Sequence, residues 1–558
     1  MERWMLLLVV LPLASALLGH LLAETLGRRV ARLSIGLSLA TFAISLVLLA
    51  HVLAGGPTGT LALSDHWGIL LLDPLGSLMA VVVSGISLIV HLFSRRYMAE
   101  EAGYVRFFVL LDLMTAALLS MVSAGDLITL LVAWHLVGVL LYFLLGQDVR
   151  NPTAYRYGFW TLLTYRIGDL PLVLAAGLLF HAYGTWSLPE IFAAMGTEPQ
   201  ALVLGTPLPE VVGGLIALSA FARSAQFLAH TWLPYTMGGP TPVSALMHAG
   251  IVNAGGFLIN RFAPLFVQTT DVLHWVFLMG LVTAVIGSVL MLAQHDVKKA
   301  LGYSTMGQMG FMIMECGVGA FSLAVYHLIA HGVFKGTLFL GAGGVIGEAR
   351  RDDGVPKDDL YTFVVERRPA RQRRPWLLMA AITLAVPAAI LFLSHSLVEE
   401  GFFHHQGAVV LLFFGWITGA QLIFATYRMR TENLARLFTL ILVSFTVVVL
   451  GYTLISHAFD LFLYPDPALR AGVYAAAGID VVWFDTLVVL VTAVIVLGWL
   501  FTYYAEQRRG RGRDWLAGPR RHAYRAISRE LFVSDLYGWA SRRMLAGAER
   551  LNTWLRWS

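Results

Sequence analysis

Residues 232–249 read WLPYTMGGPTPVSALMHA. Two closely spaced prolines, Pro240 and Pro242, follow a pair of glycines here, and each proline removes a backbone donor and disfavours a continuous helix. Irregular backbone at membrane depth is tolerated only where it is buried in protein or lines a cavity, so we predict a broken membrane helix. His230 and His248 flank the break, and broken helices beside ionisable residues are typical of transporters.

The composition around this stretch is that of a membrane protein. The chain has 558 residues, of which 58% are hydrophobic and 13% are charged. Soluble domains average about 45–50% apolar and about 25% charged residues. This apolar content excludes a disordered chain and argues strongly against an ordinary soluble enzyme. We predict an all-α polytopic membrane protein and attribute its net charge of +5 to cytoplasmic loops, not to nucleic-acid binding.

Metal and disulfide chemistry have little support in the sequence. The single cysteine, Cys316, excludes a disulfide framework or a cysteine metal site within the chain. His327 and His331 have the spacing of two zinc ligands, but the glutamate of the H-E-x-x-H motif is absent. We expect no cofactor in this chain.

Apolar runs of about 17–25 residues can cross the bilayer as helices, and we predict about 13–15 of them. The fifteen runs cover residues 4–22, 31–53, 78–94, 107–123, 126–145, 157–181, 210–229, 241–266, 272–293, 301–317, 320–345, 375–396, 408–425, 437–457 and 484–504. With the N-terminus outside, the inner loops hold 33 of the 39 Lys and Arg residues. This bias predicts that the N-terminus lies outside and the C-terminus in the cytoplasm.

The C-terminal tail differs from the spans. It is rich in arginine and carries an apolar stripe at roughly helical spacing, made of Ile527, Leu531, Phe532, Leu536 and Trp539. This pattern predicts an amphipathic helix on the cytoplasmic membrane surface. The tail either only sets the topology or docks a partner subunit.

Several spans contain ionisable residues, which are costly in a bilayer and usually functional. They are Asp112, His135, Arg166, Asp169, Arg223, His327, His331 and Lys335. Arg166 and Asp169 are three residues apart and can neutralise each other on one helix face. His327, His331 and Lys335 recur every four residues, which predicts a column of titratable groups along one face. The column is either a proton wire or a polar seam satisfied by backbone and water.

Three motifs then identify a family. The stretch 232–249, the stretch DVKKALGYSTMGQ at 296–308 and the stretch HLIAHGVFK at 327–335 resemble signatures of the proton-conducting antiporter-like subunits. These include subunits of respiratory complex I and of Mrp sodium/proton antiporters. The resemblance implies two inverted five-helix repeats with broken helices and a chain of buried charges. It carries family roles to Asp169, Arg223, His248, Lys298, His327, His331 and Lys335.

The sequence departs from the family in two places. The family's membrane glutamate is replaced by His135, and Asp112, one span earlier, is a candidate substitute. The lysine expected near Pro387 is missing, and His395 or Ser396 occupies that region. The resemblance divides the chain into N-terminal helices, two antiporter-like halves, C-terminal helices and a tail. These cover residues 1–106, 107–266, 267–425, 426–504 and 505–558.

These departures look most like the membrane subunits of the DAB inorganic-carbon accumulation systems of bacteria. The resemblance implies an inner-membrane subunit that conducts a cation, H⁺ or Na⁺. It also implies a cytoplasmic DabA-like partner that resembles a zinc β-carbonic anhydrase, so zinc is expected in the partner. A Mrp-type Na⁺/H⁺ antiporter or a complex-I-like proton-pumping subunit is the alternative, and a membrane scaffold without transport is a third.

Overall fold

The computed structural model describes residues 2–349, 457–479 and 517–555, together with Leu454, Trp483 and Thr486. Within the first range it leaves out residues 65–66, 149, 151, 197–200, 235, 237–238, 293 and 295–296. The chain divides into two compact units. The first unit gathers residues 1–317, 327–339 and 513–558, and the second gathers 318–326 and 340–512.

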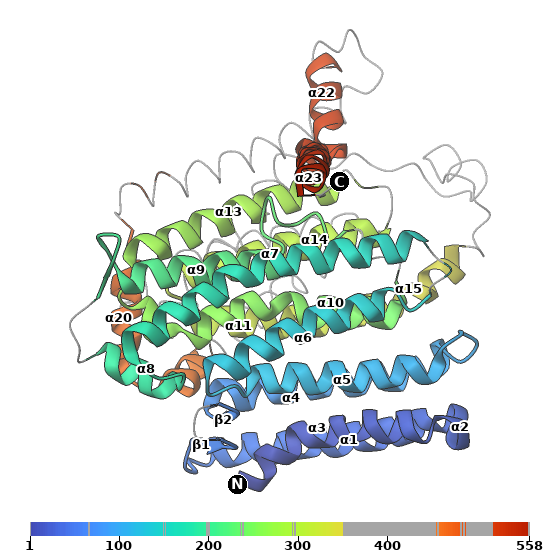
Figure 1. Ribbon diagram of the computed structural model, residues 1–558, viewed down its shortest axis with the longest axis horizontal. Coiled ribbons are helices and arrows are strands. Elements are labelled where there is room, and N and C mark those ends of the chain that lie inside the picture. Colours follow the sequence, from blue (N-terminus) through green and yellow to red (C-terminus); the bar gives the residue numbers. More distant parts are fainter. Residues whose placement is uncertain are drawn as a thin grey trace, which may run out of the picture. The chain divides into compact units, whose positions relative to one another are not determined.

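Four long helices open the first unit (Figure 1): α1 (Glu2–Leu21), α3 (Val30–Leu53), α4 (Pro74–Tyr97) and α5 (Tyr104–Val122). A short α2 (Ala23–Leu26) lies between α1 and α3, and an antiparallel hairpin of β1 (Gly59–Ala62) and β2 (Ile69–Leu72) lies between α3 and α4. Helix α4 begins where the Asp73 carboxylate accepts from the Gly76 backbone N–H at 2.8 Å. Helix α1 packs on α5 and α3 on α4, so polar side chains on their inner faces can meet.

The next helices are α6 (Leu127–Leu145), α7 (Pro152–Tyr183), α8 (Leu188–Met195) and α9 (Leu208–Arg223). A two-residue hairpin of β3 (Leu202–Val203) and β4 (Thr206–Pro207) precedes α9. Helix α7 packs against both α6 and α9. This arrangement brings the ionisable residues of three separate predicted spans to one place.

The predicted broken helix is present, but the break is longer than predicted. Helix α9 ends at Arg223, so the predicted span 210–229 is helical only to that residue. No α-helix or strand is assigned to the described residues of 224–240, and α10 (Thr241–Ala249) begins directly after Pro240. A second interruption at Gly250–Asn253 separates α10 from α11 (Ala254–Arg261), which α12 (Ala263–Phe266) follows.

The last long helices are α13 (Thr270–Leu292), α14 (Val297–Gly317) and α15 (Phe321–Ala349). Helices α13 and α14 approach closely because glycines lie in their contact. A Cβ on Gly310 would lie 2.3 Å from the backbone nitrogen of Ala284. Helix α15 meets α10 in the same way, since a Cβ on Gly332 would lie 2.5 Å from the carbonyl oxygen of Ala249. These contacts fix the spacing of the helices that carry the predicted column.

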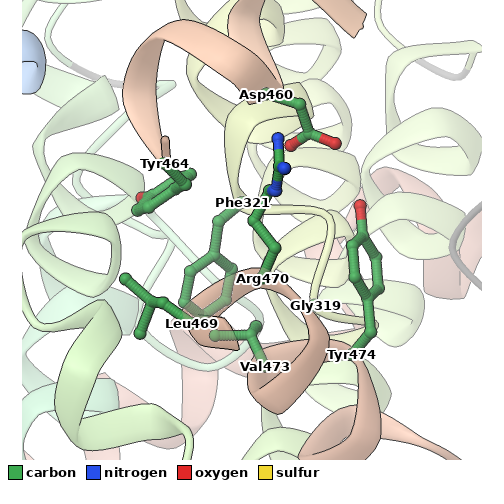
Figure 2. Close-up of a pocket in the computed structure, with 8 residues that line it drawn as sticks. All are labelled: Gly319, Phe321, Asp460, Tyr464, Leu469, Arg470, Val473 and Tyr474. Atoms are coloured by element: carbon green, nitrogen blue, oxygen red, sulfur yellow. The ribbon is translucent and has the colours of Figure 1, made fainter. Parts of the chain in front are cut away.

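The second unit contains α20 (Pro467–Ala477) and a small pocket (Figure 2). Gly319, Phe321, Asp460, Tyr464, Leu469, Arg470, Val473 and Tyr474 line it. Asp460 accepts a hydrogen bond from the Ser322 hydroxyl, and the Arg470 side chain extends toward Asp460 in Figure 2. The pocket contains none of the residues that sequence predicted for the ion pathway.

The tail is not one amphipathic helix, as predicted, but two. Helix α22 (Ala517–Ser528) and helix α23 (Val533–Leu555) are separated at residues 529–532. Glu530, Leu531 and Phe532 all have positive φ, which breaks the predicted stripe. The outer face of α23 still exposes Leu536, Trp539, Met544, Leu551 and Trp554.

The predicted all-α membrane class is confirmed. The first eleven predicted spans are all occupied by helices, and in the described part of the chain nine helices are long and apolar enough to cross a membrane. The predicted spans 375–396 and 408–425 lie outside the described residues, as do Pro387, His395 and Ser396. Of the spans 437–457 and 484–504 only isolated residues are described.

Candidate functional site

The first charged cluster is centred on the Asp169 carboxylate of α7. Arg166, one turn earlier, places its guanidinium 3.0 Å from Asp169, which is the pair that the sequence predicted. Arg223, the last residue of α9, donates to the same carboxylate at 3.3 Å. His135 of α6 brings its Nδ1 to 3.3 Å from Asp169. One carboxylate therefore faces two guanidinium groups and an imidazole.

Arg223 is enclosed by aromatic rings and backbone. Its guanidinium lies 4.3 Å from the ring centre of Trp134 and 4.1 Å from that of Tyr165. It also donates to the Trp134 carbonyl at 2.7 Å. Cation–π contacts and hydrogen bonds to oxygen stabilise a buried guanidinium, which keeps its proton at physiological pH. Arg223 is therefore built as a fixed positive charge.

His135, which replaces the family's glutamate, is joined to Arg223 only indirectly, through Asp169. His135 contacts the Arg166 guanidinium through its ring and accepts from it at its carbonyl oxygen at 3.1 Å. The His135 side chain is 54% exposed, while those of Arg223 and Asp169 are 1% and 10% exposed. The cluster thus runs from a buried cation through a carboxylate to an accessible imidazole.

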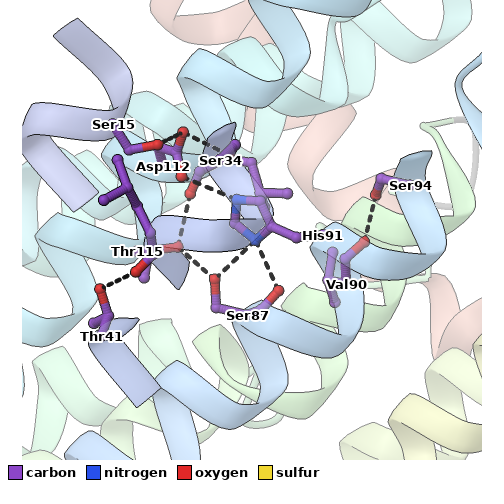
Figure 3. Close-up of polar contacts among 11 residues, drawn as sticks. Ser15, Ser34, Thr41, Ser87, Val90, His91, Ser94, Asp112 and Thr115 are labelled. Carbon is purple, nitrogen blue, oxygen red and sulfur yellow. Dashed lines mark hydrogen bonds and ion pairs between the residues drawn. The ribbon is translucent and has the colours of Figure 1, made fainter. Parts of the chain in front are cut away.

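Asp112 belongs to a different place from the one predicted. The sequence made it a candidate substitute for the family glutamate and left open whether Arg223 contacts Asp112 or Asp169, but the Asp112 carboxylate pairs with His91 of α4 at 3.1 Å (Figure 3). Ser15 of α1 and Ser34 of α3 each donate to its other oxygen at 2.7 Å. The replacement hypothesis is wrong in its geometry, because Asp112 lies among the N-terminal helices and Arg223 takes Asp169 as its carboxylate.

His91 was missed by the sequence analysis. Its Nδ1 lies 2.8 Å from the Ser87 carbonyl oxygen, which can only accept, so Nδ1 carries a proton. Its Nε2 faces the Asp112 carboxylate at 3.1 Å. The neighbouring hydroxyls are committed, because Ser87 bonds Thr115 at 2.6 Å and Thr115 donates to the Leu111 carbonyl at 2.8 Å. This network ties α1, α3, α4 and α5 together.

The second charged cluster is the predicted column on α15. His327 has Nδ1 at 3.1 Å from both oxygens of Glu315 and Nε2 at 2.9 Å from the amide oxygen of Gln308. The ring of His331 follows, 6.3 Å away between centroids. Lys335 completes the column and donates to Ser304 at 2.8 Å.

In the described part of the chain, the hydrogen-bond partners of His327 and Lys335 lie on one helix. Ser304, Gln308 and Glu315 lie on α14 at intervals of four and seven residues, so they share a helix face. Lys335 also donates to the Leu301 carbonyl at 3.3 Å. Lys335 is 1% exposed and His331 5%, so the column is buried. Glu315 and Gln308 were not predicted, because sequence spacing shows only groups on the same helix.

His248 and Lys298 lie at the edges of this column. The His248 ring stacks on Phe339 of α15 at 4.4 Å between centroids. In the described part of the chain, no hydrogen-bond partner lies within reach of either ring nitrogen of His248 or His331. Lys298 lies in the first turn of α14 and is partly exposed, one turn before the carbonyl that Lys335 contacts.

The C-terminal tail contacts the broken helix directly. The Tyr537 hydroxyl donates to the Leu228 carbonyl in the break, and its ring meets Trp160 of α7 edge-on at 5.5 Å. Burial raises the pKa of the Tyr537 phenol, so it stays a donor. Glu530, which is buried, accepts from Tyr303 of α14. The tail therefore contacts the break and the helix that faces the column.

Comparison with known proteins agrees with this architecture. Residues 124–420 match the family model described as "NADH:quinone oxidoreductase/Mrp antiporter, TM", and residues 63–108 match "NADH-Ubiquinone oxidoreductase (complex I), chain 5 N-terminus". The chain belongs to this antiporter-like family. It is 55% identical to the "Probable inorganic carbon transporter subunit DabB1" of Halothiobacillus neapolitanus, over 99% of each chain.

More distant relatives share the membrane core. Chloroplast NAD(P)H-quinone oxidoreductase subunit 5 of Ipomoea purpurea is 37% identical over 53% of this chain, which spans 42% of that relative's length. A chain of the Mrp complex from Dietzia has a TM-score of 0.61 at 24% identity, covering 98% of this chain and 60% of that one. The latter likeness shows the fold. Together these matches identify a multi-pass membrane subunit of the antiporter-like type.

Proposed function

We propose that this chain is the proton-conducting subunit of an energy-coupled inorganic-carbon accumulation complex in the bacterial inner membrane. The observation that carries the proposal is the buried column of His327, His331 and Lys335 against α14. Imidazole and a desolvated ammonium can exchange protons near neutral pH. Such groups are costly in a spanning helix and usually mark an ion pathway.

The chemistry of both charged clusters favours H⁺ over Na⁺ as the conducted ion. Alkali and alkaline-earth cations bind through oxygen ligands. The Asp169 cluster supplies one carboxylate against two guanidinium groups, which repel a metal cation. The α15 column offers mainly nitrogen donors. A proton needs no ligand cage and can move along the imidazoles.

The Asp169 cluster supplies a field and does not relay protons through its guanidinium groups. Arg223 keeps its proton, so it acts as a static counter-charge for Asp169. His135 and Asp169 are the groups there that can titrate. His248, beside the column, has ring nitrogens free to accept a proton in the described structure.

The relationship to DabB1 supports a carbon-accumulating partner. We expect a DabA-like, zinc-binding subunit that resembles a carbonic anhydrase, docked on the cytoplasmic face. Proton flow through this chain would make CO₂ hydration in that partner effectively one-way, so catalysis would lie in the partner. The family match also supports the alternative of a Mrp-type antiporter or complex-I-like subunit.

Growth of a carbonic-anhydrase-deficient bacterium in air tests the proposal. Cells carrying this chain with its partner should grow. Lys335→Met should abolish the rescue, because the column loses its ammonium group. The variant protein should remain in the membrane, because the desolvation cost of a buried ammonium is also removed. Lys299→Met, on the first turn of α14, is the matched control and should still grow. Growth of the carbonic-anhydrase-deficient cells with Lys335→Met would overturn the proposal. So would a wild-type chain that restores growth of salt-sensitive cells but not of the carbonic-anhydrase-deficient ones.

A further inference from the structure

We propose that Glu315 of α14 is the proton-accepting end of the α15 column. This inference rests on the proposed function, because it adds a residue to the same pathway. Glu315 is 3% exposed, and both of its carboxylate oxygens lie 3.1 Å from Nδ1 of His327. None of the three sequence motifs of the family includes this position.

His327 is held so that a proton can leave toward Glu315. Its Nδ1 faces a carboxylate and its Nε2 faces the Gln308 amide oxygen. A histidine ring donates from both nitrogens only when it is an imidazolium. The arrangement therefore places an ionised carboxyl beside a protonated ring, one transfer away from a neutral pair.

The column has opposite charges at its two ends. Lys335 is a buried cation whose hydrogen-bond partners in the described part of the chain, Ser304 and the Leu301 carbonyl, are neutral oxygens. Glu315 is a buried anion at the other end, with two imidazoles in between. Moving one proton from the lysine to the glutamate neutralises both buried charges. The transfer is favoured because each buried ion has a desolvation cost. Glu315 therefore favours proton movement along the column from Lys335 toward Glu315.

Each step conserves one proton. The N–H bond at Nδ1 of His327 breaks as an O–H bond forms on Glu315, which leaves a neutral ring and a carboxylic acid. Lys335 first protonates His331, whose ring nitrogens have no partner in the described part of the chain, so that the Lys335 ammonium becomes an amine and His331 an imidazolium. His331 then passes a proton to the neutral His327 by ring rotation or through a water molecule, and His327 is an imidazolium again. The net change converts ammonium and carboxylate to amine and carboxylic acid.

Proton flux into liposomes that contain the full chain with its co-purified partner tests this assignment. Glu315→Gln keeps an oxygen acceptor for His327 but cannot take a proton, so the flux should fall at least about tenfold. Glu315→Asp keeps the acid and should retain flux within about threefold of wild type. Glu190→Gln is the control, because it neutralises an exposed carboxylate on α8 that accepts a hydrogen bond from Thr185.

Infrared difference spectra supply a readout that a structural role would not move. Wild type should show a protonated-carboxyl band when acidified, and Glu315→Asp should shift this band, even if Glu315→Gln folds poorly. Glu315→Gln with wild-type flux, or a band that neither variant alters, would overturn the inference and leave the proposed function standing. Absence of flux in wild type would instead contradict the proposed function.

Discussion

At the scale of single residues, three buried carboxylates face two kinds of partner, guanidinium and imidazole. Asp169 faces two guanidinium groups that cannot release a proton, Asp112 faces His91, and Glu315 faces His327. The sequence predicted the Arg166–Asp169 pair, because both residues lie on one helix. It could not predict the Asp112 and Glu315 pairs, since their partners come from helices that only tertiary packing brings together.

This difference predicts unequal effects of two conservative changes. Asp169→Asn strands two guanidinium groups, one of them fully buried, and should destabilise the protein by about 3–5 kcal/mol. Asp112→Asn should cost less, because no guanidinium loses its partner and the asparagine still accepts from Ser15 and Ser34. Thermal unfolding in detergent measures both. Equal losses of stability would contradict the static role of Arg223.

At the scale of helices, hydropathy located the first eleven spans but not the ends of the break. The segment after Arg223 contains Phe227, Leu228, Trp232 and Leu233, so it reads as membrane helix although it forms none. In the tail, too, a continuous helix was predicted where the structure has an interruption. Its apolar stripe predicted one helix, while the structure interrupts it at residues 529–532, where Glu530 reaches Tyr303.

These tail contacts predict what truncation does. Deletion of residues 524–558 should leave the spans inserted but weaken association with the partner by at least about tenfold, since the exposed apolar face of α23 is lost. Co-purification with the partner measures this. Tyr537→Phe is the control, because it removes the bond to Leu228 but keeps α23 and should keep the partner. Wild-type recovery of partner by the truncated chain would mean that the tail only anchors the membrane surface.

At the scale of the whole molecule, composition and the family motifs predicted the class and the family, which the comparisons confirm. The division into five segments, the orientation and the cytoplasmic partner stay predictions. The first compact unit contains residues 327–339 and 513–558 together with residues 1–317. Sequence order therefore does not show which segments surround the column. That grouping places the α15 column, its α14 partners and the tail in one body.

The central claim is that protons cross this chain through the α15 column. The most direct test imposes a pH gradient on sodium-free liposomes that contain the full chain with its partner and follows the internal pH. We expect wild type to collapse the gradient and Lys335→Met to do so at least about tenfold more slowly, because the column loses its proton donor. A gradient that persists with wild type until Na⁺ is added, or that collapses equally fast with Lys335→Met, would contradict the claim.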